Sequence, residues 1–313
     1  MPIRYAFLGP EGTFAHAALR ALPESAGAEG VPFATVTMAM DALRAGSVDG
    51  ALVPLENSVE GAVPATLDEL AGGEEPLVIL NETYLPVIFD LLVRPGMALA
   101  EITTVATHPH AEAQVRRYLA DTLPHARIAL LGSTAGGAAA VSRGEYDAAV
   151  APPVAGDLYG LTTLAHDIAD HVGAVTRFVL LGRPRPPAPA TGNDRTSLVA
   201  YLRADHSGAL LEILTEFAVR GVNLTRIESR PTKTRVGQYF FTIDCEGHIG
   251  DARVGDALAA VRRICADVRF LGSYPRAEGR QGPVPTGRAD IDFARAREWI
   301  EKVQADGRPS PSA

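Results

Sequence analysis

The chain contains few cysteines and lysines. Its 313 residues include two cysteines, Cys245 and Cys265, whose wide separation lacks the paired spacing of a structural zinc site. We interpret both as reduced residues of a hydrophobic core. Lys233 and Lys302 are the only lysines, and 37 acidic side chains outnumber 29 basic ones, which gives a formal net charge of −8. A surface that binds nucleic acid is therefore not expected.

Long apolar runs are also missing. No run approaches the roughly 18 uninterrupted apolar residues of a membrane-spanning helix, and the first residues become glycine-rich too early for a signal peptide. We therefore expect a cytoplasmic protein that does not bind membranes. Hydrophobic residues (47%) and charged residues (21%) occur at frequencies typical of globular proteins, and the length predicts roughly two domains.

Common cofactor and hydrolase motifs are absent as well. The sequence has no Walker A motif, no Gly-x-Gly-x-x-Gly at the first helix and no Gly-x-Ser-x-Gly elbow. His108 and His110 lie two residues apart, and residues at that spacing do not share one face of a helix. We expect no metal and no other cofactor.

Short β-rich runs alternate with helical patterns in the first part of the chain, which predicts α/β architecture. The expected strands are residues 4–8, 31–36, 50–53, 102–107, 127–131 and 147–151, and the expected helices are residues 12–22, 39–45, 62–71, 109–120 and 134–143. Residues 77–93 are expected to form one or two long strands broken near Pro86. The pattern predicts two lobes, residues 1–76 with 161–183 and residues 77–160, joined by two crossovers that let them close on a ligand.

A proline-rich linker is expected at residues 184–194. Beyond it, residues 195–275 show the strand and helix order βαββαβ, which is the ferredoxin-like plan. The expected strands are residues 196–202, 224–229, 238–245 and 268–273, and the expected helices are residues 207–219 and 251–264. In the tail, residues 276–313, an amphipathic helix over residues 291–303 is expected to dock on the body or on a partner.

Four loops that follow predicted strands are rich in small polar residues: 9–14, 54–61, 107–111 and 132–137. Helix capping explains each of them taken singly. Together they indicate an anion-binding cleft, because ligands of open α/β sheets bind beyond the carboxyl ends of the strands. Thr176 and Arg177, a neutral donor beside a fixed cation, suit a substrate that carries a carboxylate. The alternative interpretation of residues 167–181 is a plain return strand without a role in binding.

Five motifs occur in a defined order: residues 9–14 (GPEGTF), 54–58 (PLENS), 107–109 (THP), 133–135 (STA) and 176–178 (TRF). With them the sequence resembles the prephenate dehydratase family. Residues 208–210 (GAL) and 221–231 (GVNLTRIESRP) are similar to the ACT regulatory domain of that family. The resemblance covers residues 3 to about 275. It implies a type 2 periplasmic-binding-protein-like catalytic domain of two lobes, residues 1–183, followed by an α+β ferredoxin-like ACT domain.

The resemblance implies a lyase of L-phenylalanine biosynthesis in the shikimate pathway, which converts prephenate to phenylpyruvate. Thr176 would donate a hydrogen bond to the departing hydroxyl, and Arg177 would hold a substrate carboxylate. The implied substrate-binding residues are Thr13, Asn57, Ser58, His108, Ser133, Thr134, Ala135 and Phe178. His108 is a second candidate for the proton donor. Ala174 stands where the family often has asparagine, which predicts that one donor to the substrate is missing.

Phenylalanine is the implied allosteric effector. The implied effector-binding residues are Gly208, Ala209, Leu210, Asn223, Glu228, Ser229, Arg230 and Pro231. The alternative role for this domain is dimerisation alone. On family grounds we expect a homotetramer built as a dimer of dimers.

Two alternative functions remain open from the sequence. Arogenate dehydratase performs the same elimination on the aminated substrate. A cytoplasmic amino-acid-responsive binding protein would use the two lobes as a clamp without chemistry. The sequence begins at the first expected strand, so we expect no fused chorismate mutase domain.

Overall fold

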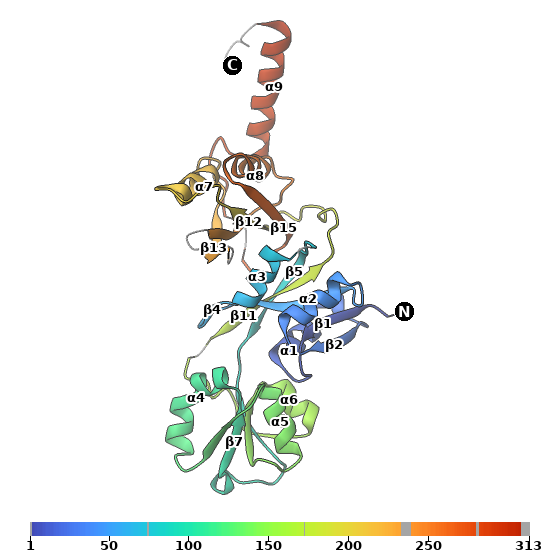
Figure 1. The fold of residues 1–313 in the computed structure, drawn as a ribbon, viewed down its shortest axis with the longest axis vertical. Coiled ribbons are helices and arrows are strands. Elements are labelled where there is room, and N and C mark those ends of the chain that lie inside the picture. Colours follow the sequence, from blue (N-terminus) through green and yellow to red (C-terminus); the bar gives the residue numbers. More distant parts are fainter. Residues whose placement is uncertain (1, 74, 172, 233–238, 280–281, 308–313) are drawn as a thin grey trace. The chain divides into compact units, whose positions relative to one another are not determined.

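The computed structural model describes residues 2–73, 75–171, 173–232, 239–279 and 282–307 (Figure 1). By their contacts, residues 1–76 and 82–183 form one unit, and residues 77–81 and 184–313 form another. The first unit contains two β-sheets, which define its two lobes, and the second contains one four-stranded sheet.

Lobe 1 is built on a sheet with the strand order β2-β1-β3-β11-β5, and β4 pairs with the outer part of β3. Strand β1 runs parallel to β2 and β3, whereas β11 is antiparallel to β3. The strands are β1 (Arg4–Leu8), β2 (Glu29–Phe33), β3 (Gly50–Asn57), β4 (Gly61–Ala62), β5 (Val78–Pro86) and β11 (Val175–Gly182). The helices are α1 (Phe14–Ala21), the short η1 (Pro23–Ser25), α2 (Val36–Arg44) and α3 (Pro64–Gly72).

The core of lobe 1 explains why these strands pair. Phe7 of β1, Leu52 of β3 and Leu180 of β11 are almost completely buried in one cluster with Leu19 of α1. Each of these side chains stabilises the fold by about 1.5–3 kcal/mol relative to an exposed position. The shared cluster fixes the three strands that carry residues 9–14, 54–58 and 176–178 next to one another.

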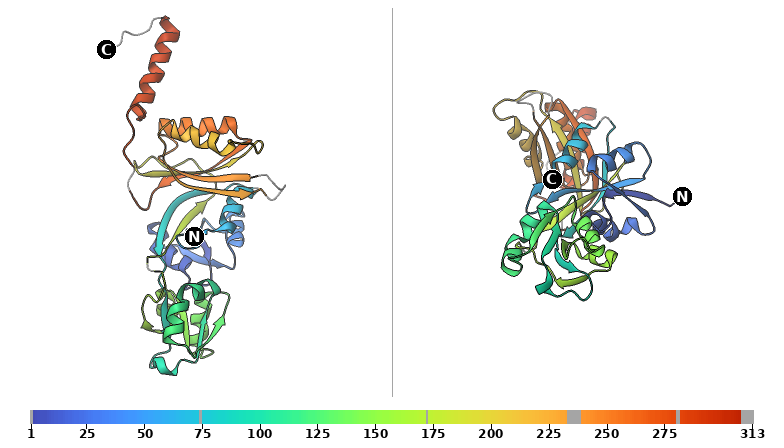
Figure 2. Two further views of the ribbon diagram at one scale, coloured as in Figure 1. Left: turned by 90° about the vertical axis from the view of Figure 1, so that its left-hand side faces the viewer. Right: turned by 60° about the horizontal axis from the view of Figure 1, so that its bottom comes forward.

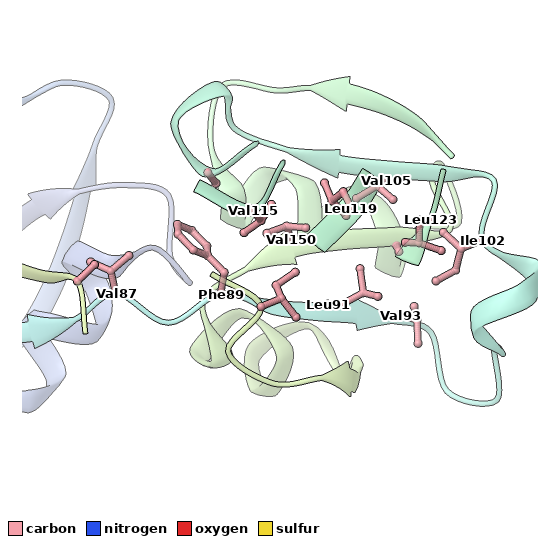
Figure 3. Close-up of a cluster of buried hydrophobic side chains, with 14 residues drawn as sticks. Val87, Phe89, Leu91, Val93, Ile102, Val105, Val115, Leu119, Leu123 and Val150 are labelled. Carbon is pink, nitrogen blue, oxygen red and sulfur yellow. The ribbon is translucent and has the colours of Figure 1, made fainter. Parts of the chain in front are cut away.

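Lobe 2 has the strand order β10-β6-β9-β7-β8. Its strands are β6 (Asp90–Val93), β7 (Thr104–Thr107), β8 (Arg127–Leu130), β9 (Ala148–Ala151) and β10 (Thr162–Ala165). Its helices are η2 (Leu99–Glu101), α4 (Pro109–Thr122), α5 (Thr134–Ser142) and α6 (Pro153–Tyr159). Leu91 of β6, Val105 of β7, Val115 of α4 and Val150 of β9 pack together in its core (Figure 3).

Sheet membership divides the lobes differently from the sequence expectation. Strand β5 was expected in lobe 2 but lies in the lobe 1 sheet, and β10 was expected in lobe 1 but lies in the lobe 2 sheet. A run of residues indicates a strand but not the strand with which it pairs. The crossovers therefore lie after Pro86 and before Val175, where the Val87 amide donates to the Ala174 carbonyl at 2.7 Å.

The second unit has the strand order β13-β14-β12-β15, with antiparallel pairs throughout. Its strands are β12 (Asp194–Tyr201), β13 (Leu224–Pro231), β14 (Tyr239–Glu246) and β15 (Asp267–Pro275), and its helices are α7 (Ala209–Ala218) and α8 (Ala252–Ile264). Both helices cover one face of the sheet (Figure 2). The predicted βαββαβ order is confirmed, although Gln238, the expected start of the third strand, lies outside the described residues.

Both cysteines lie in the core of this unit. Cys245 of β14 and Cys265 after α8 are buried and unpaired with each other, as predicted. Burial raises the pKa of both thiols, which keeps them protonated and unreactive at neutral pH.

Residues 77–81, the first part of β5 included, belong to the second unit by their contacts. Ile79 approaches Gly272 of β15 so closely that a Cβ on Gly272 would lie 2.4 Å from the Ile79 carbonyl oxygen. Gly272 also has a φ of +134°, a conformation that favours glycine. The predicted linker has neither helix nor strand until β12 begins at Asp194.

The C-terminal helix α9 (Asp290–Asp306) is longer than the predicted helix. Its start is attached to the body, because the Ala252 amide donates to Asp290 Oδ1 at 2.9 Å and Arg288 donates to the Ala218 carbonyl at 2.7 Å. Ile291 and Trp299 are about half exposed. Within the described residues, no helix is both long and apolar enough to cross a membrane.

Candidate active site

Thr176 and Asn57 lie opposite each other on paired strands. Asn57 ends β3, Thr176 is the second residue of β11, and the two are register partners. The Asn57 Nδ2 donates to Thr176 Oγ1 at 2.9 Å. Two motifs that are 119 residues apart in sequence are thereby joined by one side-chain hydrogen bond.

The orientation of the Asn57 amide is fixed by its own loop. Its Oδ1 accepts from the backbone amides of Val59 at 2.8 Å and Glu60 at 3.0 Å. An oxygen engaged in this turn leaves the NH₂ group to point at Thr176. Because the Thr176 oxygen accepts that bond, its own hydrogen is available to donate to another group. Thr176 is largely buried, at 9% exposure.

Ser58 holds the same two strands together beyond their last pair. Its amide donates to the Val175 carbonyl at 2.9 Å, and the Val175 amide donates to Ser58 Oγ at 2.9 Å. The Ser58 hydroxyl is thus engaged with the backbone directly before Thr176, where it fixes the position of that residue.

Arg177 forms a buried ion pair. Its Nε donates to Glu82 Oε2 of β5 at 2.8 Å, and the two side chains are 4% and 0% exposed. Its Nη1 lies 4.0 Å from Oε2 of Glu56, a side chain that is 40% exposed. The positive charge of Arg177 is therefore balanced by a protein carboxylate, and the guanidinium is held rigidly.

The sequence analysis did not single out Glu82. The available signal was an acidic residue within an apolar strand pattern, in residues 77–86. Such a residue is rarely buried unless it is paired.

Thr13, Ser133 and His108 each cap a helix. Thr13 Oγ1 accepts from the His16 amide at the start of α1, and Ser133 Oγ accepts from the Gly136 amide at the start of α5. His108 Nδ1 accepts from the His110 amide at the start of α4. The pKa of His108 is lowered, first by burial and then by His110, while Glu60 opposes the shift. A neutral His108 suits an acceptor at Nδ1.

Ala135 and Thr134 lie in the first turn of α5 and are both buried. A Cβ on Gly12 would lie 3.4 Å from that of Ala135, so the loop after β1 approaches the start of α5. Phe178 is 2% exposed and lies in the lobe 1 core. We therefore expect Phe178 to support the strand rather than to contact a ligand.

Ala174, the departure from the family pattern, is buried in the lobe 2 core. Its carbonyl accepts from Val87 of the other crossover. Ala174 therefore packs where the two segments that connect the lobes meet.

An open cavity of about 620 Å³ lies between the loop after β1 and α5. Gly9, Pro10, Ser133 and Gly136 are among its lining residues, whereas Thr176 and Arg177 are not. Of the predicted substrate-binding residues, it therefore contains Ser133.

Comparisons with known proteins identify the family. The prephenate dehydratase family model matches residues 5–186. A prephenate dehydratase from Amycolatopsis methanolica is 52% identical over 302 residues, which cover 96% of this chain and 98% of that protein. The chain belongs to the prephenate dehydratase family. Its members convert prephenate to phenylpyruvate, so the chain is a carbon–oxygen lyase.

The second unit contains the ACT domain, whose family model matches residues 196–263. The structure of a prephenate dehydratase from Arthrobacter aurescens in complex with L-Phe is 46% identical, has a TM-score of 0.91 and covers 97% of this chain and 100% of that one. GqqA, described as a novel type of quorum quenching acylase, is 31% identical with a TM-score of 0.76, covering 87% of this chain and 97% of that one. Proteins named for two different activities therefore share this fold.

The predicted effector residues of the ACT domain lie in two places. Gly208, with a φ of +92°, precedes α7, and Glu228 and Arg230 lie on the edge strand β13. Glu228 and Arg230 pair in register with Thr242 and Phe240 of β14. Phe241 and Ile243, which alternate with these two residues along β14, point to the core beneath the helices. Successive residues of a strand face opposite sides of the sheet, so Glu228 and Arg230 lie on the face opposite α7.

Asn223 is separate from the other effector residues. It directly precedes β13, at the far end of the 10-residue helix α7 from Gly208, which corresponds to about 15 Å of helix. It lines a cavity of about 370 Å³ together with Glu246 and Arg253. A single chain therefore does not bring all eight predicted effector residues together.

Proposed function

We propose that Thr176 is the hydrogen-bond donor that assists departure of the ring hydroxyl of prephenate. In this reaction the bond between the ring and its carboxylate breaks, and carbon dioxide leaves. The electron pair enters the ring as the carbon–oxygen bond breaks, and the departing hydroxide takes a proton and becomes water. Aromatisation to phenylpyruvate supplies the driving force.

The hydrogen bond between Asn57 and Thr176 carries this proposal. Because the Thr176 oxygen accepts from Asn57, its proton is directed to a different acceptor. A hydroxyl adds no charge beside a dianionic substrate, whereas an ionised carboxylic acid would repel it. A positioned donor that strengthens as charge develops on the leaving group contributes about 3–4 kcal/mol at comparable sites.

The substrate carboxylates are proposed to bind at the helix N-termini. Thr13, His108 and Ser133 cap α1, α4 and α5, and backbone amides at the start of a helix favour anions. The charge of Arg177 is balanced by Glu82. Arg177 and Glu82 are therefore proposed to act together as a fixed ion pair near Thr176, and Arg177 is not proposed to bind a substrate carboxylate alone.

An assay of the purified protein with prephenate tests this function. We expect phenylpyruvate to form after exhaustive chelation and without added nucleotide. Absence of turnover with intact binding would favour the clamp without chemistry. A requirement for a divalent ion would contradict the mechanism.

Arogenate should be assayed in parallel, because Glu56 gives a specific reason. Its carboxylate is 40% exposed and lies 4.0 Å from the Arg177 guanidinium. Arogenate carries an ammonium group that such a carboxylate could meet, whereas prephenate has a keto group. A higher kcat/KM with arogenate that Glu56→Gln reverses would support arogenate as the substrate.

Phenylalanine is the proposed allosteric effector, in a site shared between two copies of the ACT domain. The division of the predicted residues between opposite sheet faces and opposite ends of α7 supports a second copy. The Glu228 carboxylate and the Arg230 guanidinium are proposed to meet the ammonium and carboxylate groups, with Leu210 against the ring. Calorimetry should show weaker phenylalanine binding for Glu228→Ala and for Leu210→Ala. Unchanged affinity in both would contradict the site.

A homotetramer, built as a dimer of dimers, is the proposed assembly of this biosynthetic enzyme, and the cytoplasm its proposed location. Light scattering with and without phenylalanine tests the assembly. A monomer in both conditions would contradict the shared effector site as well.

A further inference from the structure

Glu60 joins the two lobes close to Thr176. It lies between β3 and β4 of lobe 1, and its carboxylate contacts two residues of α4 in lobe 2. Gln114 Nε2 donates to Glu60 Oε1 at 2.8 Å, and His110 Nδ1 lies 2.8 Å from Glu60 Oε2. Each carboxylate oxygen thus has its own partner on the opposite lobe.

The same residue holds the amide that points at Thr176. The Glu60 backbone amide donates to Asn57 Oδ1 at 3.0 Å, beside the bond from Val59. These bonds direct the Asn57 NH₂ group toward Thr176 Oγ1. An unbroken chain of hydrogen bonds therefore runs from α4 through Glu60 and Asn57 to Thr176.

The ion pair between Glu60 and His110 of α4 is exposed to solvent. The side chains of Glu60 and His110 are 39% and 65% exposed, and ion pairs at such exposure stabilise a fold by only about 0–1 kcal/mol. Contacts of this strength form when two lobes close and break when they separate, without unfolding either lobe.

We propose that Glu60 is a positioning residue that couples lobe closure to the catalytic hydroxyl. When α4 binds the Glu60 carboxylate, the turn over residues 57–60 is held so that Asn57 donates to Thr176. When the lobes separate, the turn loses this support and the Thr176 hydroxyl loses its direction. The inference depends on Thr176 being the donor, as proposed above.

The test compares steady-state kinetics of three variants at two positions of the chain. Glu60→Ala should lower kcat between about tenfold and a hundredfold, as small misplacements of a reacting group do, with a smaller effect on KM. Glu60→Gln keeps an oxygen that accepts from Gln114 and should restore much of kcat. Glu112→Ala is the matched control, because Glu112 pairs with Arg116 within α4, and it should leave kcat unchanged.

A double-mutant cycle separates positioning from a general structural role. In an Asn57→Ala background, Glu60→Ala should cause no further loss in kcat, because its effect passes through Asn57. Additive losses, or a change in KM alone, would overturn the proposal. Thermal unfolding of each variant confirms that the comparison is made between folded proteins.

Thr176→Ala distinguishes this inference from the proposed function. If Thr176→Ala loses activity while Glu60→Ala retains wild-type kcat, the role of Glu60 is wrong and the proposed donor stands. If Thr176→Ala retains wild-type kcat, the proposed donor is wrong, and the positioning role falls with it.

Discussion

Arg177 and Glu82 form a buried ion pair between the adjacent strands β11 and β5, with 2.8 Å between Nε and Oε2. Removal of one partner leaves an uncompensated charge in the interior. We expect Glu82→Ala to lower the free energy of unfolding by about 3–5 kcal/mol, measured by urea denaturation. The control is Glu56→Ala, because the Glu56 side chain is 40% exposed and lies 4.0 Å from Arg177. We expect this control to change the free energy of unfolding by less than about 1 kcal/mol. Equal effects would show that burial of the pair is not decisive.

Loss of the Thr176 hydroxyl should affect turnover more than substrate binding. We expect Thr176→Ala to lower kcat by a factor of about 10² or more with the fold intact, and Thr176→Ser to retain much more activity. Stopped assays over a range of prephenate concentrations separate kcat from KM. A change in KM alone would make Thr176 a binding residue, and His108 would be the next candidate.

His108 should make stability depend on pH. Burial lowers its pKa from the usual value of 6.5, so the folded state prefers the neutral ring. The stabilisation is complete above pH 6.5 and is lost as the pH falls toward the lower folded-state pKa. His108→Asn keeps an N-cap that does not titrate. The difference in free energy of unfolding between wild type and His108→Asn should therefore shift against the wild type from pH 7.5 to 5. A constant difference would exclude the titration of His108 as its source.

Gly272 should be intolerant of a side chain. Gly272→Ala adds a Cβ 2.4 Å from the Ile79 carbonyl at a φ of +134°, and strain of this kind costs about 1–3 kcal/mol. The matched change Gly72→Ala, with no atom within 4 Å of the new Cβ, should be neutral or slightly stabilising. Calorimetric unfolding measures both. Unchanged stability in Gly272→Ala would mean that the Ile79 segment shifts at no cost.

Local patterns were sufficient for many elements. Strand β1 and helix α4 begin at or within two residues of the expected positions, because β-rich runs and a proline after a capping residue carry their own signal. The short α6 and β10 were not predicted as separate elements, since seven and four residues give little periodicity. The pairing of β5 with β11 could not be predicted, because it depends on contacts between residues about 95 positions apart.

The same contrast between local signals and distant contacts applies to the candidate site. Asn57 and Thr176 were expected in one substrate site because of the resemblance to the family, and the structure joins them by a direct hydrogen bond. Glu60 and Gln114 were not singled out, because a glutamate and a glutamine in polar surroundings carry no motif. Their hydrogen bond depends on α4 lying beside the turn that follows β3, and the sequence does not reveal that placement.

Residues 77–81 have a consequence for engineering. They interrupt the sequence of the first unit yet belong to the second, and Leu77 and Ile79 are each only 2% exposed. The catalytic and regulatory parts of this chain therefore cannot be exchanged by a single cut at the linker. A chimera that grafts another ACT domain after Arg183 would mismatch this five-residue insert, so a working graft must exchange both segments together.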